Sequence, residues 1–255
     1  MPPASALAQA PSSLFIEELA AQEVGAAIAA GYNTVLVFSG SIEASGPHLA
    51  LGKHNYRARA YAERIARELG HTLVGPIVPF APTSTAERRF PGTIHVRPEV
   101  YTELNADLAR SLAAGGFKHI VLLGDHGQNQ APLKKLAPLL NAELSKSGAQ
   151  VYFSGDGYAK STQDIDEYAK SRKLVGLGHG GLWDTAELWA VAPHAVRPDR
   201  MAPGKLEGTR MDENGVAGDP RPASPELGRV FGDIRVRNAV AEIRSLLQAG
   251  RSSPQ

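Results

Sequence analysis

Two short segments of the sequence combine carboxylate and imidazole side chains with glycines. The first segment, residues 41–54, contains Glu43 and His54, and the second, residues 124–129, contains His126. Two imidazoles and one carboxylate form a common ligand set for catalytic zinc, which leaves a fourth position for water. The same set also suits non-haem Fe(II), so the residue types do not choose the metal. Glu43, His54 and His126 are therefore the candidate ligands of a divalent metal ion.

Both segments follow apolar runs that are typical of buried strands. Residues 34–38 read TVLVF, and residues 120–123 read IVLL. Short runs of this kind favour strands that are covered on both faces. In open parallel sheets, ligands lie outside the carboxyl ends of the strands. We therefore expect the two polar segments to share one site at that edge of a sheet.

The wider sequence alternates apolar strands with amphipathic helices. The expected strands are residues 34–38, a short one within 71–76, 120–123 and 150–153; the expected helices are 18–30, 55–69, 98–114, 131–146, 184–192 and 225–247. Such alternation favours a parallel sheet with helices on both faces. The sequence thus predicts the α/β class, with residues 12–255 as a single layered domain around a mainly parallel central sheet flanked by helices. Residues 197–222 are expected to form a long loop.

Composition and charge narrow the classes of partner. The net charge is +1 and no basic run stands out, which argues against a nucleic-acid or membrane-surface partner and favours a small-molecule substrate. The chain has no cysteine, which excludes disulfides, thiolate metal ligands and a thiol nucleophile. No stretch approaches the roughly 20 apolar residues that span a bilayer.

Residues 1–11 form an Ala- and Pro-rich segment that is expected to lie outside the fold. Ala8-Gln9-Ala10 resembles the small-residue site at which secretory signals are cleaved, although the charged and apolar regions that should precede it are missing. A remnant of such a signal indicates a periplasmic or secreted protein, and an ordinary disordered tail indicates a cytoplasmic one. Both interpretations stay open.

Other catalytic motifs are missing from the sequence. Ser41 and Ser45 lie beside glycines, but neither forms the G-x-S-x-G turn of the serine hydrolases. No Walker loop or dinucleotide-binding fingerprint is present. The glycine-rich residues 176–181 follow no clear strand and are predicted to form a flexible loop at the site.

Five segments, in the same order along nearly the whole chain, resemble the creatininase family (creatinine amidohydrolase and its relatives). The first, GSIEASGPHLALGKH at residues 40–54, is similar to the family's GSTEQHGPHLPLGTD. The others are FPGTI at 90–94, GDHGQN at 124–129 (NGHGGN in the family), HGGLWDTA at 179–186 (HAGxxETS) and GVAGDP at 215–220 (GVxGDP). On these motifs the chain is identified as a divergent member of the family.

The resemblance implies a layered α/β fold, a homo-oligomer (often a hexamer) and a site with two metal ions. By position, the ligands of the first metal become Glu43, His54 and His126. The ligands of the second become Ser45, His54 and Gln128. Imidazole does not normally bridge two metals, and serine and glutamine are poor ligands. We therefore predict one metal ion, in the first place Zn2+, with Mn2+ and Fe2+ as alternatives.

The resemblance also implies roles for further residues. His179 matches the family motif and is the expected proton carrier, with Asp184 to orient it or to bind the metal. Asp125 is a second candidate for that role, peculiar to this chain. The residues expected to bind substrate are Ser45, Gln128 and Trp183.

Together these features predict a metal-dependent hydrolase that uses an activated water. The expected substrate is a small polar carbonyl compound, such as a cyclic amide, a lactam, a lactone or another compound with a non-peptide C–N bond. Two alternatives remain: a metal-dependent lyase or isomerase that stabilises an enolate, and a non-catalytic binding protein on the same fold.

Overall fold

A four-stranded sheet forms the centre of the computed structural model, which describes residues 10–204 and 211–252. The strands are β1 (Thr34–Ser39), β2 (Thr72–Val74), β3 (His119–Gly124) and β4 (Gln150–Phe153). They follow the order β2-β1-β3-β4, and every neighbouring pair is parallel. All four lie where the sequence predicts strands, so the expected parallel α/β architecture is confirmed.

The strand order reverses between β1 and β3. The chain passes from β1 outward to β2, and then returns to the other side of β1 as β3 and continues to β4. At the carboxyl ends of this central pair, Ser39 lies opposite Gly124. Such a switch point leaves a crevice in which α/β proteins bind ligands. The segments after β1 and β3 contain the predicted metal ligands.

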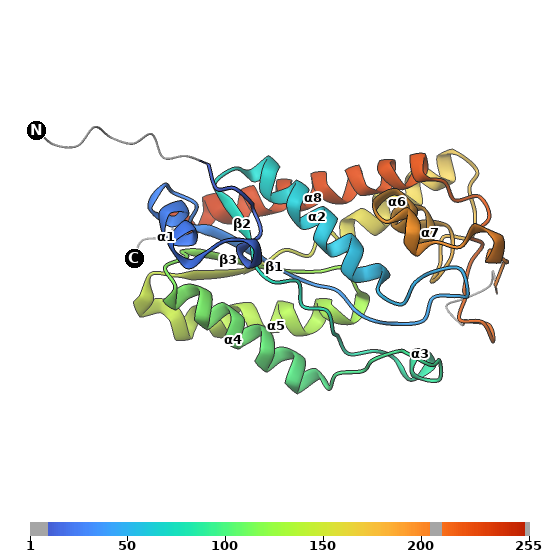
Figure 1. Ribbon diagram of the computed structural model, residues 1–255, viewed down its shortest axis with the longest axis horizontal. Helices are drawn as coiled ribbons and strands as arrows, with labels where there is room; N and C mark the ends of the chain where they lie inside the picture. The colour runs from blue at the N-terminus through green and yellow to red at the C-terminus, as the bar shows by residue number, and fades with distance from the viewer. Residues whose placement is uncertain (1–9, 205–210, 253–255) are drawn as a thin grey trace, which may run out of the picture.

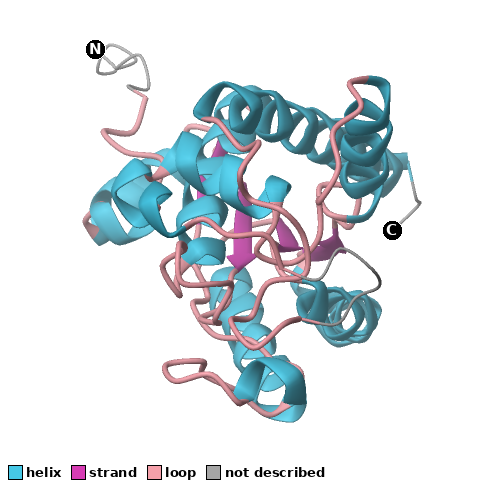
Figure 2. Ribbon diagram, turned by 90° about the vertical axis from the view of Figure 1, so that its right-hand side faces the viewer, coloured by secondary structure: helices cyan, strands magenta, loops and turns pink. Residues whose placement is uncertain are grey.

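Helices cover both faces of the sheet (Figures 1 and 2). The helices are α1 (Ala21–Ala29), α2 (Lys53–Leu69), α3 (Thr85–Arg88), α4 (Pro98–Ala114), α5 (Gly127–Leu144), α6 (Ala159–Ser171), α7 (Leu182–Val191) and α8 (Pro225–Ser252). Figure 1 shows α4 and α5 on one side of the sheet and α2 and α8 on the other. The short helices α3 and α7 lie beyond the carboxyl ends of the strands.

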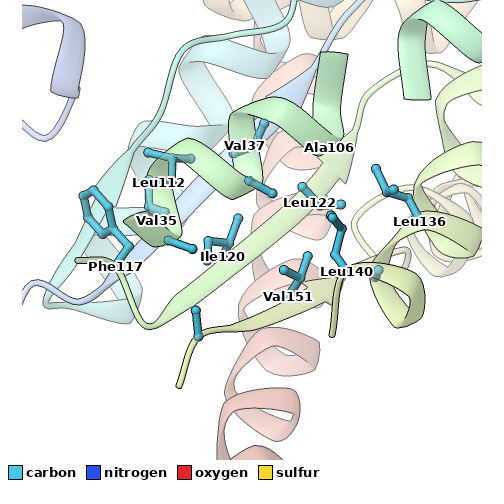
Figure 3. Packing of buried hydrophobic residues seen from close by; sticks show 14 of the residues in the cluster. Val35, Val37, Ala106, Leu112, Phe117, Ile120, Leu122, Leu136, Leu140 and Val151 are labelled. Atoms are coloured by element: carbon cyan, nitrogen blue, oxygen red, sulfur yellow. The ribbon is translucent and has the colours of Figure 1, made fainter. Parts of the chain in front are cut away.

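Alternation along the strands explains the two layers. Val35 and Val37 face the α4–α5 layer, whereas Leu36 and Phe38 face α2 and α8, because successive side chains of a strand point to opposite faces. Figure 3 shows the first of these cores. Full burial of an aliphatic side chain contributes about 1.5–3 kcal/mol. A rigid sheet therefore supports the loops at its edge.

The structure shifts several helix boundaries from those predicted. Helix α5 begins at Gly127 rather than near residue 131; Pro132 suggests a helix start but here lies in the second turn, where it removes only one hydrogen bond. Helix α2 begins two residues earlier than expected, at Lys53. Helix α6 was not predicted, because few of its residues are apolar: its buried ones are Ser161, Ile165 and Ala169.

The remaining expectations concern the termini and loops. Residues 197–204 and 211–222 form a loop as predicted, apart from one 3-10 turn at Pro198–Arg200, and residues 205–210 lie outside the described part. Most of the expected tail, residues 1–9, also lies outside it. Within residues 10–204 and 211–252, no helix has the length and apolar character needed to cross a membrane.

Candidate metal centre

The three predicted metal ligands meet at the crevice between β1 and β3. Glu43 lies on the loop after β1, His54 in the first turn of α2, and His126 between β3 and α5. His54 Nε2 is 2.8 Å from Glu43 Oε1, and His126 Nε2 is 2.7 Å from Glu43 Oε2. One ligand atom of each side chain falls within a group spanning at most 4.8 Å. All three side chains are buried.

The Glu43 carboxylate is incompletely satisfied. Its Oε2 is buried and forms an ion pair with His126 Nε2 at 2.7 Å, but it accepts no well-aligned hydrogen bond from the described residues. A buried charge is costly unless it is both paired and hydrogen-bonded. Burial alone would raise the pKa of Glu43, but Lys53 and the two histidines hold it well below its usual range. A buried anion between two imidazoles fits a divalent cation.

Asp125 fixes the orientation of His54. His54 Nδ1 lies 2.7 Å from Asp125 Oδ2, and a carboxylate can only accept, so Nδ1 carries the proton. Nε2 faces Glu43 Oε1 at 2.8 Å, and on loss of its proton its lone pair could bind a metal beside Glu43. A carboxylate behind a ligating histidine is the usual arrangement in metal sites. Burial would raise the pKa of Asp125, but Arg57 and His54 lower it. This aspartate, predicted as a proton carrier, therefore has the geometry of an orienting group.

Lys53 occupies the other side of Glu43. Its Nζ lies 2.6 Å from Ser45 Oγ, 2.7 Å from Asp184 Oδ2 and 3.2 Å from Glu43 Oε1. Burial would lower the pKa of Lys53, but Asp184 and Glu43 raise it, so the side chain is an ammonium. Ser45 is fully buried, and its hydroxyl contacts Lys53 and His179. The structure thus places Ser45 beneath the pocket rather than in its wall, where a substrate-binding residue was expected.

Arg57 links both sides of the site to the protein interior. It donates hydrogen bonds to Asp125, Asp184 and Glu187 at 2.6–3.0 Å, and Glu187 also pairs with Arg235. Arginine side chains are usually exposed, yet the exposure of Arg57 is 2%. The sequence feature that could have indicated its burial is its position four residues after Lys53, which places both side chains on the same, buried face of α2.

His179 reaches the site from the glycine-rich loop. Its Nε2 is 2.9 Å from the Ala44 carbonyl, so Nε2 carries the proton and Nδ1, 3.7 Å from Glu43 Oε1, has the lone pair. Burial and Lys53 lower the pKa of His179. Asp184 accepts from the Gly180 N–H at 2.9 Å rather than from this imidazole. The loop packs tightly: at Gly180, with φ of +63°, a Cβ would lie 2.7 Å from the Ser45 carbonyl oxygen.

Glu87 is a site residue that sequence reasoning did not find. It lies in the short helix α3. Its carboxylate lies close to the Glu43 carboxylate and the His179 ring, and the three form a second group that could hold a metal ion. Its Oε1 is 3.9 Å from His126 Nε2, while its Oε2 accepts from the Ser84 N–H at 2.5 Å. Ser84 and Glu87 have the S-x-x-E spacing of a capping box, which was the available signal.

These groups border a polar cavity of about 210 Å³. Two of the predicted substrate-binding residues, Gln128 and Trp183, line it, together with Tyr158. The indole Nε1 of Trp183 is buried and has no hydrogen-bond partner among the described residues. Gln128 is exposed to solvent. The cavity therefore offers unused polar groups next to the ligand set.

Comparisons with known proteins agree with this architecture. A family model described as creatinine amidohydrolase matches residues 17–243. A creatinine amidohydrolase of Pseudomonas putida is 25% identical over 252 residues, covering 91% of this chain and 96% of that protein. A mycofactocin precursor peptide peptidase of Mycobacterium tuberculosis (strain CDC 1551 / Oshkosh) is 27% identical over 218 residues, covering 77% and 78%.

Solved structures share the fold. A creatininase described as a Mn form and a variant creatininase of Zn–Zn type each give a TM-score of 0.78 at 24% identity, covering 92% of this chain and 98% of theirs. The buried carboxylate and paired imidazoles suit a metal-dependent amidohydrolase. The chain belongs to the creatininase family, whose members hydrolyse C–N bonds.

Proposed function

We propose that this chain hydrolyses a C–N bond in a small polar carbonyl compound, with one divalent metal ion held by Glu43, His54 and His126. The observation that carries the proposal is the buried Glu43 carboxylate, whose Oε2 lacks a hydrogen bond among the described residues and lies 2.7 Å from His126 Nε2. Zn2+ is our first choice, and Mn2+ or Fe2+ suit the same ligands. When bound, such an ion polarises a substrate carbonyl and lowers the pKa of a water molecule.

His179 is the proposed proton carrier. Its neutral ring directs the Nδ1 lone pair toward the metal ligands, because Nε2–H is held by the Ala44 carbonyl. Such a group can accept a proton from water and return it to the leaving nitrogen. Glu87 is the second candidate, since its Oε1 reaches the same region. Asp184 supports the His179 loop through Gly180, and Asp125 orients His54.

The cavity supports a small substrate. A volume of about 210 Å³ is below the roughly 300–1,000 Å³ of sites for drug-sized ligands. The Trp183 side chain lines the cavity and offers its ring as an apolar surface to a substrate. The exposed Gln128 amide can bind a polar group at the entrance. Cyclic amides and lactams have the size, the polar atoms and the C–N bond that these contacts and this reaction require.

The end of a peptide is a second candidate substrate. The relatives include mycofactocin precursor peptide peptidases, and the entrance beside Gly127 and Gln128 is exposed to solvent. A terminal residue could enter the cavity while the rest of the chain stays outside. A lyase or isomerase remains the mechanistic rival, and incorporation of 18-O from solvent into product separates it from a hydrolase.

The test is a turnover assay with a matched pair of variants. Metal-loaded and chelated protein are compared on a panel of lactams, cyclic ureides and short peptides, with product detected by mass spectrometry. We expect turnover by the loaded protein that Glu43→Gln abolishes and that Glu63→Gln, a change at an exposed carboxylate, leaves intact. Equal turnover after Glu43→Gln, or retention of metal by Glu43→Ala, would contradict the ligand assignment.

A further inference from the structure

We infer that the Lys53 ammonium is a built-in second cation, which takes the position that a second metal ion would need and limits the site to one. The inference rests on the proposed function, since it assumes a metal at Glu43, His54 and His126. It assigns Lys53 a positioning role, because the ammonium contacts Glu43, a proposed metal ligand. Three observations carry it: the contacts of the ammonium, the sharing of Glu43, and the charge balance of the buried network.

The Lys53 ammonium donates hydrogen bonds to Ser45 and Asp184 and forms an ion pair with Glu43. An ammonium has three N–H donors, and three acceptors lie within 3.2 Å of Nζ: Ser45 Oγ, Asp184 Oδ2 and Glu43 Oε1. Its side-chain exposure is 1%. A charge buried this deeply is costly unless it is fully paired. The oxygen-lined position is thus filled by a covalently tethered cation that cannot diffuse away.

Glu43 is shared between the two cation positions. Its Oε1 is 3.2 Å from the Lys53 ammonium, whereas its Oε2 lies beside His126 without a hydrogen bond. Oε1 also lies 2.8 Å from His54 Nε2, so the ammonium and a proposed metal ligand share this oxygen, and Oε2 is left for a metal. Ser45, which a position-by-position reading makes a ligand of a second metal, instead accepts from Lys53.

The charges of the buried network match one divalent ion. Shared ion pairs connect the buried charged side chains around the site into one network. Its carboxylates are Glu43, Glu87, Asp125, Asp184 and Glu187, and its basic side chains are Lys53, Arg57 and Arg235. Five negative charges against three positive ones leave a charge of −2 when the histidines are neutral. One divalent ion neutralises it, and two would leave an excess of +2. Without Lys53 the deficit would grow to −3.

The test counts bound metal. Purified full-length protein is stripped with a chelator, titrated with Zn2+, desalted and analysed by elemental analysis, for wild type and three variants. Lys53→Ala removes the charge and opens the space, Lys53→Met removes the charge but keeps most of the volume, and Lys170→Ala changes an exposed lysine. We expect one equivalent for wild type, Lys53→Met and Lys170→Ala, and close to two for Lys53→Ala.

The outcomes separate this inference from the proposed function. Two equivalents in wild type, or one in a folded Lys53→Ala, would overturn the inference while leaving a metal hydrolase possible. No metal in wild type would overturn both. If Lys53→Ala does not fold, Lys53→Ser takes its place with the same expected count of close to two, and one equivalent in folded Lys53→Ser overturns the inference. One equivalent in wild type and two in Lys53→Ala, without turnover of any substrate, would support the inference and argue against the proposed hydrolase activity.

Discussion

The two sides of Glu43 differ in how far their polar atoms are satisfied. On the His126 side, Glu43 Oε2 and His126 Nδ1 are buried without hydrogen bonds to the described residues. On the Lys53 side, a tethered ammonium holds Ser45, Asp184 and Glu43 Oε1 at 2.6–3.2 Å. In our proposal, the His126 side binds a metal ion from solution, whereas the Lys53 side already contains a cation, the ammonium. Unsatisfied buried atoms, more than residue types, thus indicate where a ligand belongs.

The largest effect is expected from breaking the link between the two sides. Arg57 contacts Asp125 on one side and Asp184 on the other. Arg57→Met leaves these buried carboxylates without their cation, so we expect a loss of about 3–5 kcal/mol in the free energy of unfolding. Urea denaturation of the metal-free protein measures it. The control Arg67→Met, at an exposed ion pair, should stay within about 0.5 kcal/mol of wild type.

Paired substitutions on the two sides should affect metal binding unequally. His126→Ala removes a proposed ligand, so we expect Zn2+ affinity to fall by more than the 10–100-fold typical of partners behind the ligands. Ser45→Ala removes a partner of Lys53 and His179 but no proposed ligand, and should change the affinity by less than about tenfold. Competition with a fluorescent chelator measures both. Similar losses in the two variants would mean that the sides do not differ as described.

Asp125 tests whether the support of His54 matters. Asp125→Asn keeps the shape of the side chain but removes the charge that faces His54 Nδ1 and Arg57. We expect a 10–100-fold loss of Zn2+ affinity, with the same stoichiometry, in the same chelator competition. Asp166→Asn, at an exposed ion pair, is the control. A change in stoichiometry would instead make Asp125 a direct ligand.

The smallest of these expected effects is the change in metal affinity per pH unit. Burial would lower the pKa of His126, but Glu43 and Glu87 raise it to about 9 in the metal-free protein. Between pH 6.5 and 9 a metal must displace this proton, so we expect affinity to rise about tenfold per pH unit and to level off above 9. The same raised pKa stabilises the metal-free fold below pH 6.5, and this contribution is lost as the pH rises through 9. Affinity that is flat over this range would contradict the proposed ligand role of His126.

The sequence predicts the sheet and the ligand set better than it predicts the groups around them. Strongly apolar runs define β1 and β3, and the ends of parallel strands bring Glu43 and His126 together. The burial of Lys53 and Arg57 could not be predicted in the same way, because lysine and arginine are usually exposed and only tertiary pairing pays for their burial. Glu87 could not be predicted as a site residue for another reason: its position depends on the path of a loop, which local sequence patterns do not determine.

The structure explains why several residues differ from the family motif together: the differing residues contact one another in the fold. His54 stands where the motif has aspartate, and Asp125 stands where it has glycine; in the fold these two side chains form a hydrogen bond of 2.7 Å. Lys53 and Ser45 likewise lie eight residues apart in the sequence and 2.6 Å apart in space. Each pair was visible in the sequence as two unrelated departures.

Anomalous diffraction from crystals grown with Zn2+ would test the central claim most directly. The account predicts one strong peak per chain at the zinc edge, bonded to Glu43, His54 Nε2 and His126 Nε2, with Lys53 Nζ still held by Asp184. Two peaks at the site, a peak bonded to other side chains, or no peak would contradict it.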